Sequence, residues 1–448
     1  MIPRPPAAGS TRSATAGMPA SGWRLGALYG PAVYGVSAAA VALPDTALHL
    51  RVTGATLAWV LTAYAAGVGV GAVTAGRLAD SRGSRPVLIA AATLLIAGAV
   101  LCAVAPTLAA VVTGRVLLAV GSGSVIVTAL TSTAQLPAGR RPAALAAFGA
   151  CLAGFSATAP LAGAIAAHLS WRAALVLPVL SVAAVPLCWP LTAHVPRRGR
   201  VDWPAAGLLA VVAAGLLLTA QHAAGQAGVR TTVIGIVTTA AAAASLAIRQ
   251  RAHPDGLLGR RILSAGWFRR AAATGASVYA GLFAVLYAAP HLLTRQGHGT
   301  VGIGLLLLPG AVVGAGLAWT TARLAGRLPA GRALAAVSLL QAAALCYAAA
   351  DPRSWPVAAA STVAFTASAV AQTLLTAQTT TYTAVDVRGG AIGLLSLVFF
   401  LGGGCGAALC SALWQASGPT TALTVIAVLP AVGAVVVWPT RHGDRWMG

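Results

Sequence analysis

The sequence predicts an all-α integral membrane protein, and three observations support that prediction. Hydrophobic residues make up 58% of the chain and charged residues only 8%, whereas a soluble domain carries roughly 45–50% apolar and about 25% charged residues. Apolar runs of about twenty residues recur along the chain, and each is long enough to cross a bilayer as a helix. The arginines gather in the short segments between these runs, as topology signals do.

Fourteen apolar windows divide the chain, and we expect a transmembrane helix at each. An even number of crossings places both termini on the same side of the membrane. The windows fall at residues 27–48, 57–76, 86–105, 108–133, 141–166, 172–193, 204–221, 231–248, 270–292, 300–322, 332–350, 355–378, 389–414 and 420–438.

The arginine distribution tests this count independently of the hydropathy. All 29 basic residues are arginine. When the termini and every second loop are assigned to the cytoplasm, 23 of the 29 fall on that side, five fall on the other, and Arg115 lies within the fourth window. Because cytoplasmic loops carry the excess of basic residues, the pattern predicts cytoplasmic N- and C-termini in a multi-pass protein of a bacterial inner membrane.

The net charge of +22 does not indicate a nucleic-acid partner, since the arginines are spread over many loops rather than clustered on one face. The six cysteines lie in or beside apolar runs without a C-x-x-C pair, and the eight histidines show no metal-ligand spacing. We therefore expect no metal, no cofactor and no catalytic residues. The chain is not predicted to be an enzyme.

Two Ala-rich windows stand between two sets of six, which predicts two six-helix halves with two additional central helices. The expected segments are a disordered cytoplasmic tail over 1–26, an N-terminal half over 27–193, a linker with the inserted helices over 194–248, a cytoplasmic loop with the C-terminal half over 249–438, and a cytoplasmic tail over 439–448.

The loop after the second window reads G-R-L-A-D-S-R-G-S-R-P over residues 76–86. Its glycines permit a tight turn, and one acid among three arginines can pair with them or cap a helix end. The loop resembles the G-x-L-A-D-x-x-G-x-[RK] motif of the major facilitator superfamily, which implies a conformational latch between the halves on the cytoplasmic side. A positive-inside turn with an incidental Asp is the alternative. The latch residues would be Gly76, Asp80, Arg82, Gly83 and Arg85.

An isolated arginine, Arg115, lies within the fourth apolar window. A charged side chain at a helix centre costs about 2.5–3.5 kcal/mol, so we expect a buried side chain with a function. The segment resembles the superfamily's R-V-L-Q-G-x-G sequence, whose arginine is associated with proton coupling, although Leu118 and Ala119 depart from it. An arginine near the outer helix end that extends to the surface is the alternative.

The fifth window contains Pro160 and Gly163, residues that let a helix bend and pack closely. This segment resembles, in degraded form, the G-P-x-x-G-G signature of antiporters. Together with V-A-L-P at 41–44 and W-V-L-T-A-Y at 59–64, it makes the chain similar to the fourteen-helix drug-exporter branch of the superfamily, the drug:proton antiporters.

The chain has few acids for proton-coupled export of cations, a process that usually needs a carboxylate within the bilayer. All seven acids are Asp, and none falls at a predicted midplane. Gly35 stands where the branch often has Asp, and Phe399-Phe400 stands where it usually has Arg-Gln. Asp45, at an outer helix end, is the best protonatable candidate, with a solvated helix-end Asp as the alternative. Neutral or anionic substrates are therefore favoured, with Arg115 as an anion contact.

The resemblance implies export of a small molecule, such as a drug, antibiotic or metabolite, by alternating access. Coupling to protons stays open. Import of a nutrient or metabolite by the same fold, and a membrane sensor without transport, are the alternatives. The expected partners are a small-molecule substrate and the lipid bilayer, without nucleic acid, and the expected state is a monomer. Candidate cavity-lining residues are Tyr64, Thr128, Gln341 and Gln372.

Overall fold

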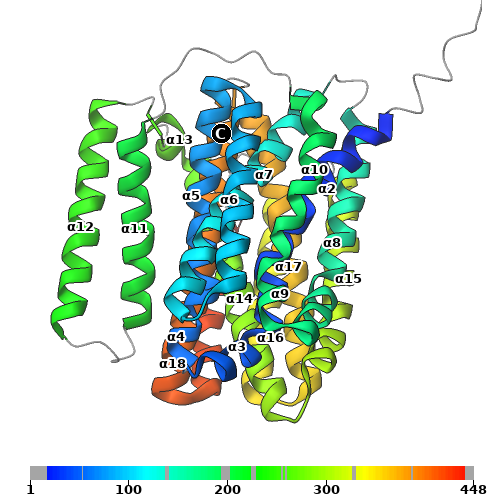
Figure 1. The fold of residues 1–448 in the computed structure, drawn as a ribbon, viewed down its shortest axis with the longest axis vertical. Coiled ribbons are helices and arrows are strands. Elements are labelled where there is room, and N and C mark those ends of the chain that lie inside the picture. The colour runs from blue at the N-terminus through cyan, green and yellow to red at the C-terminus, as the bar shows by residue number, and fades with distance from the viewer. Residues whose placement is uncertain are drawn as a thin grey trace, which may run out of the picture.

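The structure, a computed structural model, describes residues 18–52, 54–136, 141–192, 202–222, 229–253, 256–257, 260–324, 329–384 and 387–438. Within these ranges all regular secondary structure is helical. Figure 1 shows the long helices standing side by side along one axis, with α11 and α12 at one edge of the bundle.

The first part of the chain folds into long helices joined by short turns, with shorter helical pieces after α2 and after α8. Its elements are α2 Met18–Val41, α3 Leu43–Leu50, α4 Gly54–Leu57, α5 Trp59–Arg82, α6 Ser84–Val104, α7 Leu108–Gln135, α8 Arg141–Leu169, α9 Trp171–Val176, η1 Leu177–Leu180, α10 Ser181–Cys188 and η2 Trp189–Thr192.

The second part contains the central pair of helices and a further set of long helices. Its elements are α11 Trp203–His222, α12 Val229–Ala252, α13 Arg260–Ser264, α14 Gly266–Arg295, α15 Thr300–Leu324, α16 Ala330–Ala350, α17 Ser354–Tyr382 and α18 Arg388–Val437.

Twelve helices of the described residues are long and apolar enough to cross a membrane, and the count reaches thirteen when α2 and α3, bent by 61° at a short break, form one span. One of the twelve, α18, has 50 residues with non-helical dihedral angles at Gly418 (φ 84°, ψ 174°). At ~1.5 Å per residue a helix of this length exceeds twice the ~30 Å hydrocarbon core. The chain therefore changes direction at Gly418, between the two last apolar windows.

Several element boundaries differ from the sequence expectation. Helix α2 begins at Met18, inside the segment 1–26 that was expected to be a disordered tail, while residues 1–17 and 439–448 lie outside the described residues. The window 172–193 is not one regular helix, because it alternates α and 3-10 turns around its prolines. Proline removes a backbone donor, and the helix tightens or breaks where the donor is missing.

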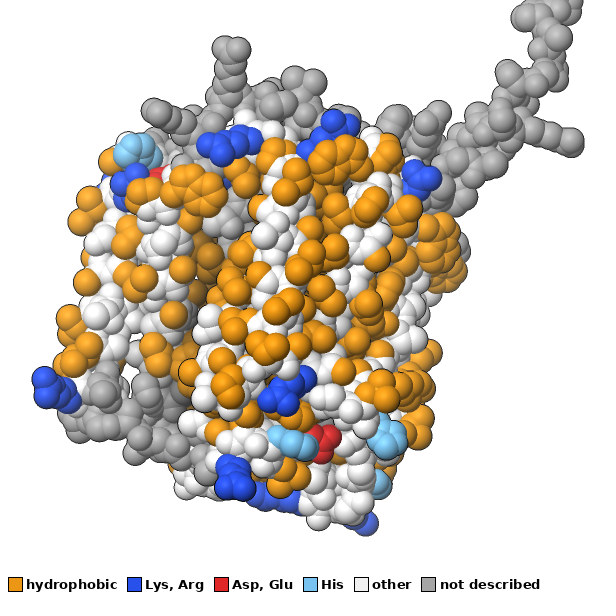
Figure 2. Space-filling view, in the orientation of Figure 1, with side chains coloured by type: hydrophobic (Ala, Val, Ile, Leu, Met, Phe, Trp, Pro, Cys, Tyr) orange, Lys and Arg blue, Asp and Glu red, His pale blue; other side chains and the backbone are white. Residues whose placement is uncertain are grey.

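Glycines bring the helix axes close together inside the bundle. A Cβ at Gly123 of α7 or Gly406 of α18 would overlap a backbone carbonyl of α5 or α14, respectively. Close approach at small residues is how transmembrane helices gain packing energy without a hydrophobic driving force between them. Apolar side chains cover the middle of the face in Figure 2, and arginines appear toward its two ends.

The pair α11–α12 attaches to the bundle through one helix only. Helix α11 packs against α5 and α18, whereas the main packing partner of α12 among the described elements is α11. At the contact between the pair, a Cβ at Gly215 would overlap Thr239. Most of α12 therefore faces outward, as its position at the edge of Figure 1 shows.

Candidate functional site

Arg115 of α7 is fully buried, with 0% exposure. Its Nε donates to the Val60 carbonyl at 3.3 Å, its Nη1 donates to the Leu175 carbonyl at 3.0 Å, and its Nη2 donates to the Gly35 carbonyl. These acceptors belong to α5, α9 and α2, respectively. The guanidinium therefore joins four helices through a fork of donors that lysine does not have.

The Tyr64 ring packs against the Arg115 guanidinium. The Arg115 guanidinium carbon lies 4.1 Å from the centroid of the Tyr64 ring, a cation–π distance. The Tyr64 hydroxyl donates to Ser122 Oγ at 2.9 Å and lies 3.2 Å from the Ala32 carbonyl. Within the described residues, no carboxylate contacts Arg115. Backbone dipoles and an aromatic ring take the place of an anion.

Gly35 explains why no acid occupies this place. A Cβ at Gly35 would overlap the Tyr64 hydroxyl, so any larger side chain displaces Tyr64. The backbone carbonyl of Gly35 instead accepts a bond from Arg115. The absence of a side chain at Gly35 and the binding of the buried cation by carbonyls are therefore parts of one arrangement.

At the opposite end of α5, Gly76 and Asp80 meet the start of α18. A Cβ at Gly76 would lie 2.6 Å from the Gly389 carbonyl oxygen, and a Cβ at Gly389 would lie 2.7 Å from Asp80 Oδ1. The Asp80 carboxylate thus lies against the first turn of α18, where helix NH groups carry partial positive charge. The Arg77 Nε also donates to the Leu257 carbonyl at 3.0 Å. This end of α5 holds the N-terminal half against the C-terminal half.

A second contact between the halves lies at the other end of the bundle. The Thr300 hydroxyl, at the first residue of α15, donates to Asp45 Oδ2 at 3.0 Å. Asp45 stands in the first turn of α3, and His49 Nδ1 lies 2.8 Å from its backbone carbonyl. This side-chain hydrogen bond joins the short bent helix to the start of α15.

Between these two contacts, the C-terminal half contains a cluster of aromatic rings from α14 and α18. Tyr279 stacks on Phe399 at a centroid distance of 5.0 Å and meets Phe400 edge-on at 5.7 Å, while Phe283 meets Phe400 at 6.2 Å. The Tyr279 hydroxyl donates to Gln372 Oε1 of α17 at 2.6 Å. Phe400 and Gln372 remain partly exposed. Tyr279, Phe283 and Phe399 are buried, so Phe400 and Gln372 are the accessible members of this cluster.

A sequence profile described as Major Facilitator Superfamily matches residues 25–377, most of the chain. The chain belongs to the Major Facilitator Superfamily. Its members are membrane transporters and not enzymes, so the helices above are those of a multi-pass transporter of this superfamily.

Curated relatives from this superfamily match part of the chain. The MFS-type transporter YhcA of Bacillus subtilis is 25% identical over 281 residues, which are 61% of this chain and 53% of the relative. The multidrug resistance protein Stp of Mycobacterium tuberculosis is 27% identical over 297 residues, which are 64% of this chain and 55% of the relative. The chain therefore spans about half the length of these relatives.

Solved structures of transporters share the fold. A POT family peptide transporter aligns with a TM-score of 0.64 at 16% identity, covering 94% of this chain and 96% of that one. The human organic anion transporter MFSD10 aligns with a TM-score of 0.60 at 16% identity, covering 94% of this chain and 98% of that one. At such identities the likeness shows the fold alone.

The superfamily loop motif after α5 is placed differently from the expected turn. Gly76 lies within the helix and packs against Gly389, so it makes no turn. Only Gly83, with φ at 87°, takes the left-handed backbone conformation that reverses the chain. The Arg85 guanidinium carbon lies 5.2 Å from the centroid of the Trp189 ring, and Arg82 is exposed.

The expected bending residues of the fifth window lie inside one continuous helix, α8. A Cβ at Gly163 would lie 2.5 Å from Ala38 Cα of α2, and a Cβ at Gly304 of α15 would lie 3.0 Å from the Pro160 carbonyl. The segment therefore serves close packing on both sides of α8, against α2 in its own half and against α15 in the other half.

The four candidate cavity residues fall into two groups. Tyr64, Thr128 and Gln341 are fully buried between helices, where Thr128 bonds to the Ser124 carbonyl of its own helix and Gln341 Nε2 donates to the Val278 carbonyl at 3.0 Å. Gln372 alone is partly exposed. Their role in lining a cavity stays a prediction.

Two elements of this arrangement were missed by sequence reasoning. Thr300 gives no motif signal, since a threonine at a helix start is common. Tyr279 lies in an apolar helix without distinctive spacing. The departure at Phe399-Phe400, however, was visible in the sequence and coincides with the aromatic cluster. The described residues hold no group of three or more His, Cys, Asp or Glu side chains suited to a metal.

Proposed function

We propose that this protein exports a small, uncharged, aromatic-rich molecule across the cytoplasmic membrane of a bacterium by alternating access of its two halves. The observation that carries the proposal is the aromatic cluster of Tyr279, Phe399 and Phe400 with Gln372, set between two contacts that join the halves. The partly exposed Phe400 ring beside the Gln372 amide suits a flat apolar molecule with a polar group, and the buried Tyr279 and Phe399 rings support it from behind.

The charge distribution supports a neutral cargo. Arg115 has three hydrogen bonds and no exposed surface, and the rings of the cluster carry no charge. A cationic drug would find no carboxylate among the residues of that cluster. An anion that contacts Arg115 would first have to displace the carbonyl partners of this side chain. A neutral substrate is therefore favoured over an anionic one.

Fourteen spans with cytoplasmic termini are part of the proposal. The bent pair α2–α3 forms one span, and the reversal at Gly418 divides α18 into two. Fourteen spans then agree with the fourteen apolar windows. The end of the bundle that carries the α5–α18 contact would be cytoplasmic, because the arginine-rich loops lie there.

Two movable contacts support alternating access. The Asp80 contact with the start of α18 would close the cytoplasmic end, and the Asp45–Thr300 bond would close the outer end. Transport requires that each opens while the other holds. Asp45 is the acid at which protonation would weaken such a contact, since a neutral carboxyl is a weaker acceptor. Export, rather than import, is favoured by the multidrug resistance relatives.

The deciding experiment measures steady-state accumulation of three fluorescent probes, one neutral and aromatic, one cationic and one anionic. The host is an efflux-deficient bacterium that expresses the chain or carries empty vector. We expect lower accumulation of the neutral probe only, with the difference lost in Phe400→Ala and kept in Gly207→Ala, whose added Cβ meets open space. Greater accumulation would indicate import. Probe binding without flux in proteoliposomes would indicate a sensor.

An uncoupler separates proton-driven export from other mechanisms in the same cells. If protons drive the process, the uncoupler abolishes the difference in accumulation, and Asp45→Asn weakens its dependence on the pH gradient. Retention of full pH-gradient dependence by both Asp45→Asn and Asp80→Asn would remove these two carboxylates from the coupling mechanism.

A further inference from the structure

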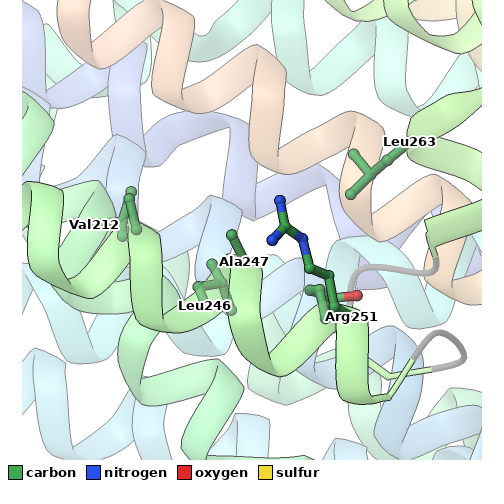
Figure 3. Close-up of a pocket in the computed structure, with 7 residues that line it drawn as sticks. Val212, Leu246, Ala247, Arg251 and Leu263 are labelled. Atoms are coloured by element: carbon green, nitrogen blue, oxygen red, sulfur yellow. The ribbon is translucent and has the colours of Figure 1, made fainter.

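A pocket lies at the edge of the bundle, between the edge helices α11 and α12 and the short helix α13. Its volume is about 350 Å³, within the roughly 300–1,000 Å³ that small-molecule sites span. Its lining residues are Val212, Ala243, Leu246, Ala247, Gln250, Arg251 and Leu263. Figure 3 shows side chains of α11, α12 and α13 around this space.

The pocket is built along one stripe of α12. Its five lining residues from that helix follow the spacing i, i+3, i+4, i+7 and i+8, so they share a single face. The apolar members lie toward the middle of the helix, and Gln250 and Arg251 lie in its last turn. The polarity of the pocket thus rises toward the end of the span, the end at which a membrane helix meets the lipid headgroups.

Two polar groups at the headgroup end have no partner within the protein as described. Arg251 is exposed and makes no hydrogen bond or ion pair among the described residues, whereas its neighbour Arg249 is held by Asp202 at 2.7 Å. Gln250 Oε1 is buried and lacks a donor. Buried acceptors nearly always receive a hydrogen bond. The Gln250 side-chain carbonyl therefore suits a hydrogen-bond donor on a ligand in the pocket.

We propose that this pocket binds an anionic glycerophospholipid of the bilayer, of the phosphatidylglycerol type. An acyl chain would fill the apolar part between Val212 and Leu246. The Arg251 guanidinium would hold the phosphate, and a headgroup hydroxyl would donate to Gln250 Oε1. Basic pockets between transmembrane helices recognise anionic headgroups by this combination of charge and apolar depth.

Such a lipid also accounts for the weak attachment of α12. Its main packing partner among the described elements is α11, and most of its surface faces outward. A lipid wedged between α11, α12 and α13 would add contacts to a helix that otherwise packs mainly on α11. The lipid would act as a structural partner of the edge pair, independently of any cargo that the protein moves.

The test uses the purified full chain, delipidated in detergent and incubated with phosphatidylglycerol or phosphatidylcholine. Lipid that remains after size exclusion is quantified by mass spectrometry. We expect the wild type to retain about fivefold more phosphatidylglycerol than phosphatidylcholine, as one basic residue near an anionic headgroup provides. Equal retention of the two lipids would overturn headgroup recognition.

Two pairs of variants locate the binding. Arg251→Gln is expected to lower phosphatidylglycerol retention about fivefold, whereas Arg230→Gln, at the other end of the same helix, leaves it unchanged. Ala247→Trp fills the pocket and is expected to abolish retention, whereas Ala241→Trp, on the opposite side of α12, does not. Each variant must elute as a monodisperse peak. Wild-type retention by Arg251→Gln or by Ala247→Trp would overturn the proposal.

Discussion

The interiors of the two halves of this transporter differ in polarity. The N-terminal half buries a full positive charge, Arg115, and holds it with three backbone carbonyls and the Tyr64 ring. The C-terminal half buries Tyr279 and Phe399 in a stack, with one amide as its main polar contact. The Arg115 contacts are charged and directional, whereas the ring contacts are apolar.

This difference in polarity implies a difference in how rigid the two interiors are. The Arg115 fork has fixed geometry and joins four helices, so it favours one arrangement of the N-terminal half. Stacked and edge-on rings hold through non-directional contact and tolerate shifts of ligand or helix. We infer that the N-terminal half supplies the rigid wall of the pathway and the C-terminal half supplies its adaptable surface.

Removing the charged fork should give the largest effect. Arg115→Ala leaves a cavity at the junction of α2, α5, α7 and α9, and large-to-small core substitutions cost about 2–5 kcal/mol. Arg115→Lys should recover only part of this loss, because one ammonium cannot bond three diverging carbonyls. Thermal unfolding in detergent, followed by loss of the monodisperse peak, measures both variants.

The matched control for this substitution is Arg230→Gln, which removes an exposed arginine at the end of α12. This variant should unfold at the same temperature as the wild type. If Arg115→Lys were as stable as the wild type, the charge alone, and not the fork geometry, would hold the N-terminal half. That result would contradict the rigidity that we assign to the N-terminal half.

The contact between the halves should give the second largest effect. In Gly76→Ala the new Cβ would lie 2.6 Å from the Gly389 carbonyl oxygen, and neither backbone can yield cheaply. Overpacking of this kind costs about 1–3 kcal/mol, which we expect to separate α5 from α18 and to slow export of the neutral probe roughly tenfold. Gly207→Ala adds the same methyl group in open space and should export at the wild-type rate.

A smaller effect is expected within the aromatic cluster. Tyr279→Phe removes the hydroxyl that donates to Gln372 Oε1 and keeps the ring that stacks on Phe399. Loss of one such bond costs roughly 0.5–1.5 kcal/mol. If the cluster binds the cargo, this loss should appear mainly as a raised KM for the neutral probe in proteoliposomes. A lowered maximal rate at unchanged KM would place Tyr279 in the conformational change rather than in binding.

Hydropathy predicted the all-helical membrane fold, because it depends on residue type alone, while the orientation that the arginines predict stays a prediction. The break between the last two windows corresponds to the reversal at Gly418. An isolated arginine in an apolar run predicted the burial of Arg115, since charge in hydrocarbon is expensive. Its partners were not predictable, because the carbonyls of Gly35, Val60 and Leu175 leave no mark on the sequence.

The aromatic cluster was hidden for a different reason. Helix α18, which supplies Phe399 and Phe400, is apolar on all sides, so periodicity does not tell which of its faces meets a neighbour. Phe399 and Phe400 stood out only as departures from a resemblance. The role of Gly76 was misjudged because glycine serves both turns and close helix contacts, and only the position of α18 decides between them.

The smallest effect is expected at an exposed loop of the C-terminal half, where charge does not join helices across the core. The Arg353 guanidinium donates to Asp351 Oδ1 at 2.7 Å and lowers the pKa of that carboxyl below its ordinary value. A carboxyl with a lowered pKa in the folded chain stabilises it above the unfolded-state pKa, and this contribution disappears as the pH falls through the folded-state pKa. Asp351→Asn should therefore unfold slightly earlier than the wild type at pH 7, and the two should converge at strongly acidic pH. Because Arg353 is exposed and Asp351 is partly exposed, solvent screens the pair. A loss of stability at pH 7 as large as that of Arg115→Ala would show that this surface pair contributes as much to the fold as the buried arginine does.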